Sequence, residues 1–142
     1  MRIRGVEFAK IIEAVTVHSY KIYDGKNDVA KVLQDADKMS GIGLGILGIT
    51  KYFGGRDYVN SEEILRIWKD RKKMRKLSDY ALQRIDDEDM VRTVMSGIEY
   101  LLEWKKTIHT ESAKSLIRGD FEYLIRCRDF LTRKFNLLAT SF

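Results

Sequence analysis

The stretch DDEDMVRTVMSGIEYLL, residues 86–102, carries the clearest helical pattern in the sequence. The four acidic residues at its start suit the first turn of a helix, where the backbone dipole is positive. The apolar residues that follow recur at spacings of three and four, so the stretch predicts an amphipathic helix with one buried face. That face consists of Val91, Val94, Met95, Ile98, Leu101 and Leu102.

Apolar residues keep this spacing along most of the chain. Asn27 or Asp28 can cap the second of the resulting helices. No segment alternates β-branched with polar residues for more than a few positions, and the sequence contains neither proline nor an internal repeat. We therefore predict an all-α fold in which residues 1–142 form a single helical domain, a compact multi-helix bundle. The expected helices are 6–22, 29–39, 42–53, 60–68, 74–85, 86–102 and 116–131.

Composition excludes several classes of protein. Apolar residues make up 44% and charged residues 33% of the 142 residues, which excludes disorder over most of the length. The longest uncharged stretch, residues 39–50, is shorter than the roughly 20 apolar residues that cross a bilayer, so we expect no membrane-spanning segment. No uninterrupted apolar run follows the basic start of the chain. We therefore expect no signal peptide and a cytoplasmic location.

Cys127 is the single cysteine of the sequence. One cysteine excludes an internal disulfide and a cysteine-based zinc cage. Arg126 and Arg128 on either side favour the thiolate through their charge. Because no base is arranged around it, we interpret Cys127 as a packing residue of the last helix.

The sequence GLGILG at residues 43–48 matches G-x-G-x-x-G, the fingerprint of dinucleotide-binding turns. That turn needs a strand before it and a βαβ unit around it, whereas the preceding residues are helical and acidic. We therefore interpret Gly41, Gly43, Gly45 and Gly48 as positions where another helix approaches closely.

Asp35 and Asp37 are two residues apart, which on a helix separates their side chains by about 200°. Both therefore cannot point at one site unless the helix ends there. Apolar neighbours on either side predict partial burial, and a buried carboxylate needs a cation, a hydrogen-bond donor or a metal. This makes Asp37 a candidate ligand.

Residues 29–39 read VAKVLQDADKM and are followed by Gly41 and an apolar segment. This stretch resembles the helix that carries the distant aspartate ligand in the HD-domain metal-dependent phosphohydrolases. The resemblance implies an HD-domain-like helical bundle, a nucleotide or phosphoester substrate, and a divalent cation: Mn²⁺, Mg²⁺, Ni²⁺ or Fe²⁺. It also implies that Asp37 is the metal ligand, with Lys38 beside it as a candidate catalytic residue.

Two further segments are similar to the same family. VTVHS at residues 15–19 resembles a helix end of one subgroup, which implies that His18 borders the active site and steadies substrate or a bound water. HTESAK at residues 109–114 is similar to a threonine–glutamate segment near the end of that subgroup. We interpret His109 itself as a capping or surface residue.

The chain departs from the family at the other metal ligands. The family site needs a lone histidine and an adjacent His-Asp pair, but here His18 precedes serine and His109 precedes threonine. A divalent metal held by one carboxylate competes poorly with its own water shell. The chain therefore resembles the C-terminal portion of the family, N-terminally truncated, with an incomplete metal site.

Three accounts of this departure are open: a degenerate relative, a split enzyme completed by another polypeptide, or a start codon placed downstream of the true one. Each account predicts exposed apolar surface where further helices would pack. Contiguous apolar patches of that kind mark interfaces. We therefore expect a homo-oligomer or a partner chain.

A basic cluster provides an alternative. Between Arg66 and Lys76 seven cationic residues accompany only Asp70, a net charge of +6. With Tyr58 and Trp68 nearby to stack on bases, this segment suits a basic helical nucleic-acid-binding or protein-interaction module. The same cluster would also draw an anionic nucleotide toward a phosphohydrolase cleft.

Overall fold

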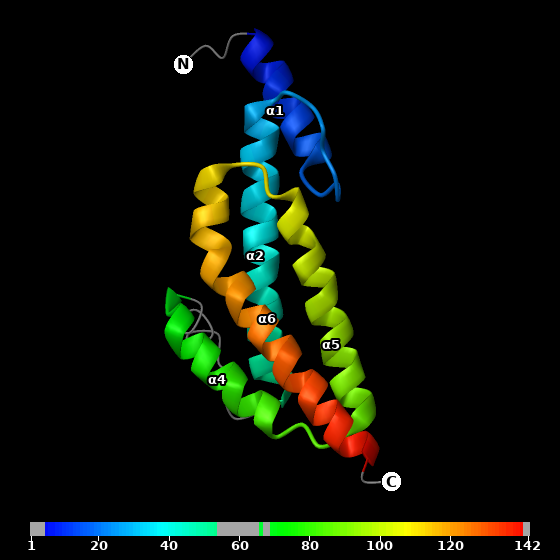
Figure 1. The fold of residues 1–142 in the computed structure, drawn as a ribbon. Helices are drawn as coiled ribbons and strands as arrows, with labels where there is room; N and C mark the ends of the chain where they lie inside the picture. The colour runs from blue at the N-terminus through cyan, green and yellow to red at the C-terminus, as the bar shows by residue number, and fades with distance from the viewer. Residues whose placement is uncertain (1–4, 54–65, 67–68, 141–142) are drawn as a thin grey trace.

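The computed structural model describes residues 5–53, 66 and 69–140. Every regular element in these ranges is helical, which confirms the all-α prediction. Three long helices, α2, α5 and α6, run alongside one another, α4 packs against α2 and α6 near one end, and α1 lies at the other end (Figure 1). The elements are α1 (Gly5–Val17), α2 (Asp28–Phe53), α4 (Arg71–Gln83), α5 (Glu88–Glu103), the 3₁₀ helix η2 (Trp104–Thr107) and α6 (Glu111–Thr140).

The core lies between α2, α4, α5 and α6. On α5 the buried residues are Val91, Val94 and Ile98, which confirms the apolar face predicted for residues 86–102. Asp87 caps α5, since its side chain accepts a hydrogen bond from the N–H of Met90. The other helices contribute further buried side chains to the same cluster, chiefly Ile42, Ile46, Met74, Leu82, Ile117, Phe121, Leu124 and Leu131.

Residues 28–53 form one continuous helix, so the prediction of separate helices over 29–39 and 42–53 was wrong. Packing against α5 and η2 explains the continuity. A Cβ atom on Gly41 would lie 2.6 Å from the indole ring of Trp104, and one on Gly45 would approach Leu101 as closely. The glycines therefore admit neighbouring side chains, which confirms the close-packing interpretation for these two positions. For Gly48 the interpretation was wrong, since nothing lies within 4 Å of a Cβ atom built there.

The first helix ends at Val17, five residues earlier than predicted. The imidazole Nδ1 of His18 donates to the carbonyl of Val15 at 2.6 Å, and the Tyr20 N–H donates to the carbonyl of Val17 at 3.0 Å. These bonds satisfy carbonyl groups that the end of a helix leaves without partners. The chain then turns away from the helix axis.

Asn27 caps the second helix. Its Oδ1 accepts hydrogen bonds from the N–H groups of Val29 (3.1 Å) and Ala30 (3.4 Å). Of the two candidate caps, the structure therefore selects Asn27. The predicted helix over 60–68 falls outside the described residues apart from Arg66.

Candidate functional site

Helix α1 buries very little of its apolar surface. Ala14 is its only buried residue. The apolar positions Phe8, Ile11 and Val15 are 56%, 40% and 57% exposed. Exposed apolar side chains gathered along one side of a helix are typical of an interaction surface.

Helix α2 carries a second exposed stripe. Val29, Leu33 and Leu44 are 45%, 37% and 57% exposed. Their spacing of four and eleven residues places them on one side of the helix. Asp37 follows Leu33 by one turn and Ser40 precedes Leu44 by one turn; both are exposed, so a carboxylate and a hydroxyl interrupt the apolar stripe.

Helices α1 and α2 lie side by side and run in the same direction (Figure 1). Two hydrogen bonds between them establish this register. The amide of Asn27 donates to the carbonyl of Lys10 at 2.8 Å, and seven residues further along each helix the amide of Gln34 donates to the carbonyl of Val17 at 2.7 Å.

The loop at residues 18–27 covers one flank of this helix pair. There the Tyr23 hydroxyl donates to the Glu13 carboxylate at 2.7 Å. A helix turns by about 100° per residue, so Ile11 and Val15 lie on the flank of α1 opposite Glu13.

On α2 the same reasoning places Val29 and Leu33 away from Gln34, which faces that loop. Because the two helices are parallel, both apolar stripes lie on the same side of the pair. We call this surface the α1–α2 face; its members are Phe8, Ile11, Val15, Val29, Leu33 and Asp37. The exposed apolar surface expected from the sequence is therefore confirmed.

Asp35 and Asp37 point in different directions, as their spacing predicts. Asp35 is 2% exposed, and its carboxylate accepts three hydrogen bonds of 2.8 Å: from the N–H of His109 and from the N–H and Oγ1–H of Thr110. Asp37 is exposed. The prediction of burial was therefore correct for Asp35 and wrong for Asp37. The buried carboxylate of Asp35 is satisfied by hydrogen-bond donors and not by a metal.

Gln34 joins three segments of the chain. Its amide nitrogen donates to the carbonyls of Val17 (2.7 Å) and Tyr20 (3.0 Å), so its oxygen faces His109 Nε2 at 2.9 Å and accepts a hydrogen bond from it. Burial lowers the pKa of His109. His109 is thus a structural residue, neither a cap nor a free surface group. The sequence carried no local signal for this role, because Gln34 and His109 are 75 positions apart in the chain.

The HTESAK segment starts the last helix. The hydroxyl of Thr110 accepts a hydrogen bond from the N–H of Ala113 at 3.2 Å while it donates to Asp35. Thr110 therefore caps α6 and attaches that cap to α2.

The structure does not bring the predicted site residues His18, Lys38 and Asp37 together at one site: the Asp37 side chain is exposed, whereas that of Lys38 is buried. Lys38 is 5% exposed, its ammonium donates to the carbonyl of Thr107 at 3.0 Å, and burial lowers its pKa. His18 is half-buried at the end of α1. No hydrogen bond or ion pair joins any two of these three side chains. Within the described ranges, no group of three or more histidine, cysteine or acidic side chains is placed to hold a metal.

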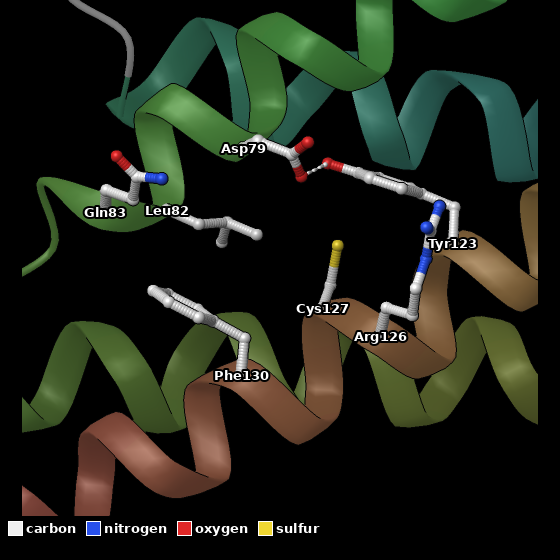
Figure 2. Close-up of a pocket in the computed structure, with 7 residues that line it drawn as sticks. All are labelled: Asp79, Leu82, Gln83, Tyr123, Arg126, Cys127 and Phe130. Atoms are coloured by element: carbon white, nitrogen blue, oxygen red, sulfur yellow. Dashed lines mark hydrogen bonds between the residues drawn. The ribbon is translucent and has the colours of Figure 1, made fainter.

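Cys127 lies at a cavity of about 260 Å³ between α4 and α6. Figure 2 shows its sulfur pointing into this space, beside the hydrogen bond of 3.0 Å that Tyr123 donates to Asp79. Burial raises the pKa of Cys127 to about 11, so the charge of Arg126 beside it does not produce a thiolate. The interpretation of Cys127 as a packing residue agrees with its burial.

Part of the basic cluster is used by the fold. Arg75 forms an ion pair of 2.7 Å with the buried carboxylate of Asp120, and Arg71 approaches the same carboxylate at 3.7 Å. Tyr58 and Trp68 lie outside the described residues. Four lysines remain exposed on or just before α4: Lys69, Lys72, Lys73 and Lys76.

In the described part of the chain, none of the helices has the length and apolar character that a membrane span requires. The comparisons with known proteins found no relative: neither a protein-family model, nor a curated protein, nor a solved structure matches this chain.

Proposed function

We propose that this chain is a subunit of a metal-dependent phosphohydrolase similar to the HD-domain enzymes, completed by a helical partner chain. In this proposal Asp37 supplies one ligand of a divalent cation and the partner supplies the histidines. The observation that carries the proposal is the position of Asp37, an exposed carboxylate one helical turn beyond the exposed Leu33 on the α1–α2 face.

The apolar residues around Asp37 support the need for a partner. Five large apolar side chains of the α1–α2 face are 37% to 57% exposed. Exposed apolar patches of more than a few hundred Å² mark interaction sites on soluble proteins. A helical partner with its own apolar stripe suits two parallel helices of this kind.

The charge of Asp37 constrains the partner further. A carboxylate that becomes buried in an interface must meet a cation or hydrogen-bond donors. Imidazole side chains that hold a divalent cation against Asp37 would satisfy it. Among the described residues no group of three or more histidine, cysteine or acidic side chains could hold a metal, and a cation held by Asp37 alone would be bound weakly.

The substrate class, a nucleotide or another phosphoester, rests on the resemblance of residues 29–39 to the HD-domain helix. The buried contacts of Asp35, Gln34 and Lys38 support a positioning role for the same helix. They attach α2 to η2 and to the start of α6 and thereby hold Asp37 on a rigid element, as a metal ligand requires.

The test is metal content of the native assembly. The tagged chain is expressed in its own host, and the isolated complex is analysed by native mass spectrometry and elemental analysis. We expect a partner and about one divalent ion per complex, and we expect Asp37→Asn to lose the ion while retaining the partner.

Asp89→Asn is the matched control, because Asp89 is exposed on α5 away from the α1–α2 face. It should keep both partner and ion. Unchanged metal content in Asp37→Asn would remove Asp37 from the site. A complex that forms through the α1–α2 face but binds no metal would instead establish the chain as a protein-interaction module.

Nucleic-acid binding is a second candidate, favoured by the exposed lysines of α4. It predicts binding to single-stranded nucleic acid that is independent of metal and falls steeply with added salt. Lys72→Glu together with Lys76→Glu should then abolish binding, whereas Asp37→Asn should leave it unchanged.

A further inference from the structure

Residues 5–26, which comprise α1 and the loop after it up to Asn27, bury very few side chains; we call them the N-terminal arm. Ala14 is the only buried residue among them. The arm packs along the first part of α2 (Figure 1). Because hydrophobic burial is the main favourable force in helix packing, an arm that buries one alanine gains little stability from it.

Hydrogen bonds from two buried amide side chains hold the arm in place. Asn27 donates to it at 2.8 and 3.0 Å, and Gln34 donates to it at 2.7 and 3.0 Å. The four acceptors are, in the same order, the Lys10 carbonyl, the Glu13 carboxylate and the carbonyls of Val17 and Tyr20. Water replaces such bonds when they open, so each contributes only a small net free energy. The arm is therefore bound much less firmly than the helices of the core.

Gln34 also connects the arm to His109. Its oxygen accepts a hydrogen bond from the imidazole Nε2 at 2.9 Å. The ring of Tyr23, which belongs to the arm, stands edge-on to the imidazole with the ring centroids 6.3 Å apart, while its hydroxyl donates to Glu13. The arm thus covers part of the imidazole. Burial lowers the pKa of His109, and release of the arm would remove part of that burial.

The charged groups around His109 lie outside the arm and stay in place when it leaves. Asp35 favours the imidazolium form, whereas Lys31, Lys38 and Lys114 oppose it. Release of the arm therefore changes the exposure of the imidazole to water and leaves these charges beside it. Since water stabilises the imidazolium, His109 takes up a proton more readily when the arm is released, and a falling pH favours release.

We propose that the N-terminal arm is a pH-sensitive switch: it detaches from α2 as one unit while the helical core stays folded, and protonation of His109 favours the detached state. Detachment separates α1 from α2, so the α1–α2 face exists only while the arm is bound. The switch thereby couples pH to the availability of that face. This inference rests on the contacts of the arm and is independent of the proposed phosphohydrolase function.

The test is hydrogen–deuterium exchange of the full chain, followed by mass spectrometry at pH 7.5 and 5.5 and corrected for intrinsic exchange rates. The backbone amides of α1 should exchange through local opening, at least about tenfold faster than those of α5 and independently of low urea concentrations. The amides of α5 should require global unfolding. Acidification should increase the opening of α1 about threefold or more.

Three variants separate the parts of the switch. His109→Gln keeps a donor toward Gln34 but cannot be protonated, so the opening of α1 should lose its dependence on pH. Gln34→Met removes both of its hydrogen bonds to the arm and should increase the opening about tenfold at either pH. Gln83→Met is the matched control at an exposed position of α4 and should leave the opening and its pH dependence unchanged.

Protection of the α5 amides verifies that each variant folds. If Gln34→Met loses that protection, Tyr23→Phe replaces it, since loss of the hydroxyl bound to Glu13 should increase the opening about threefold. Three results would overturn the inference. In the first, α1 exchanges with the rate and urea dependence of α5. In the second, α1 exchanges at the intrinsic rate at pH 7.5. In the third, acidification leaves α1 unchanged, or opens it equally in His109→Gln.

Discussion

Asp35 and Thr110 are 75 positions apart in the sequence, yet both the N–H and the hydroxyl of Thr110 donate to one carboxylate oxygen of Asp35 at 2.8 Å. The N–H of His109 donates to the other oxygen. The buried carboxylate of Asp35 on α2 thus accepts hydrogen bonds from the backbone N–H groups of the two residues that precede α6. This contact fixes which side of α2 faces the core and therefore which side carries Asp37.

Replacement of Asp35 should destabilise the protein strongly. Asp35→Asn puts an NH₂ group where a carboxylate oxygen accepts hydrogen bonds, and we expect a loss of roughly 2–4 kcal/mol in the free energy of unfolding. Asp37→Asn is the matched control, with an expected change within about 0.5 kcal/mol because its side chain is exposed. Urea denaturation measures both. Equal effects of the two substitutions would contradict the assignment of Asp35 as the buried contact.

Replacement by alanine should change the free energy of unfolding in opposite directions at Gly41 and Gly97, two glycines with similar neighbours in the sequence. Gly41→Ala places a Cβ atom 2.6 Å from the Trp104 ring and should cost about 1–3 kcal/mol. Nothing lies within 4 Å of a Cβ atom on Gly97, so Gly97→Ala in the exposed face of α5 should stabilise by about 0.5–1 kcal/mol. Thermal or urea unfolding distinguishes them. A stabilising Gly41→Ala would show that α2 does not approach η2 this closely.

His109 should make stability depend on pH. Burial lowers the pKa of His109 in the folded protein below the ordinary value of 6.5. As the pH falls below about 6.5, the imidazole is therefore protonated more fully in the unfolded chain than in the folded protein. Stability should therefore fall as the pH drops from 7.5 to 5. His109→Gln preserves a donor toward Gln34 and should show a smaller fall, measured by urea unfolding at the two pH values. An identical pH dependence in the variant would exclude this contribution.

Cys127 should be unreactive in the folded protein. Its pKa of about 11 leaves roughly one thiol in a thousand ionised at pH 8, and the side chain is 2% exposed. We expect alkylation by iodoacetamide at pH 8 to be at least about a hundredfold slower in buffer than in urea, as followed by mass spectrometry. Comparable rates in the two solvents would show that the α4–α6 cavity opens readily.

Disruption of the α1–α2 face should separate association from folding. Ile11→Asp combined with Leu33→Asp places charges on exposed apolar positions, so the isolated chain should keep its helical content and unfold at a similar urea concentration. The same variant should lose its partner in size-exclusion chromatography with light scattering. Loss of helical content in the isolated variant would mean that these residues stabilise the fold itself.

Local sequence was sufficient to locate most of the described helices and to narrow the cap of α2 to two residues. The apolar spacing in residues 86–102 predicted the buried face of α5, and Asn27 was one of two expected caps for α2. The cap rests on hydrogen bonds within three positions of Asn27, and the direction of the α5 face follows from the helical period. The end of α1 and the continuity of α2 were predicted incorrectly, because hydrogen bonds in the loop at 18–27 and packing of Trp104 on Gly41 decided them.

At the candidate site, too, the sequence determined one feature and the tertiary structure determined another. From sequence alone it followed that Asp35 and Asp37 point about 200° apart, since the pitch of a helix sets the angle between any two of its side chains. Which of them faces inward depends on the neighbours of α2, and only the tertiary structure decided this, by placing the donors of His109 and Thr110 against Asp35. A helical period determines relative directions, whereas burial is a property of the whole packed molecule.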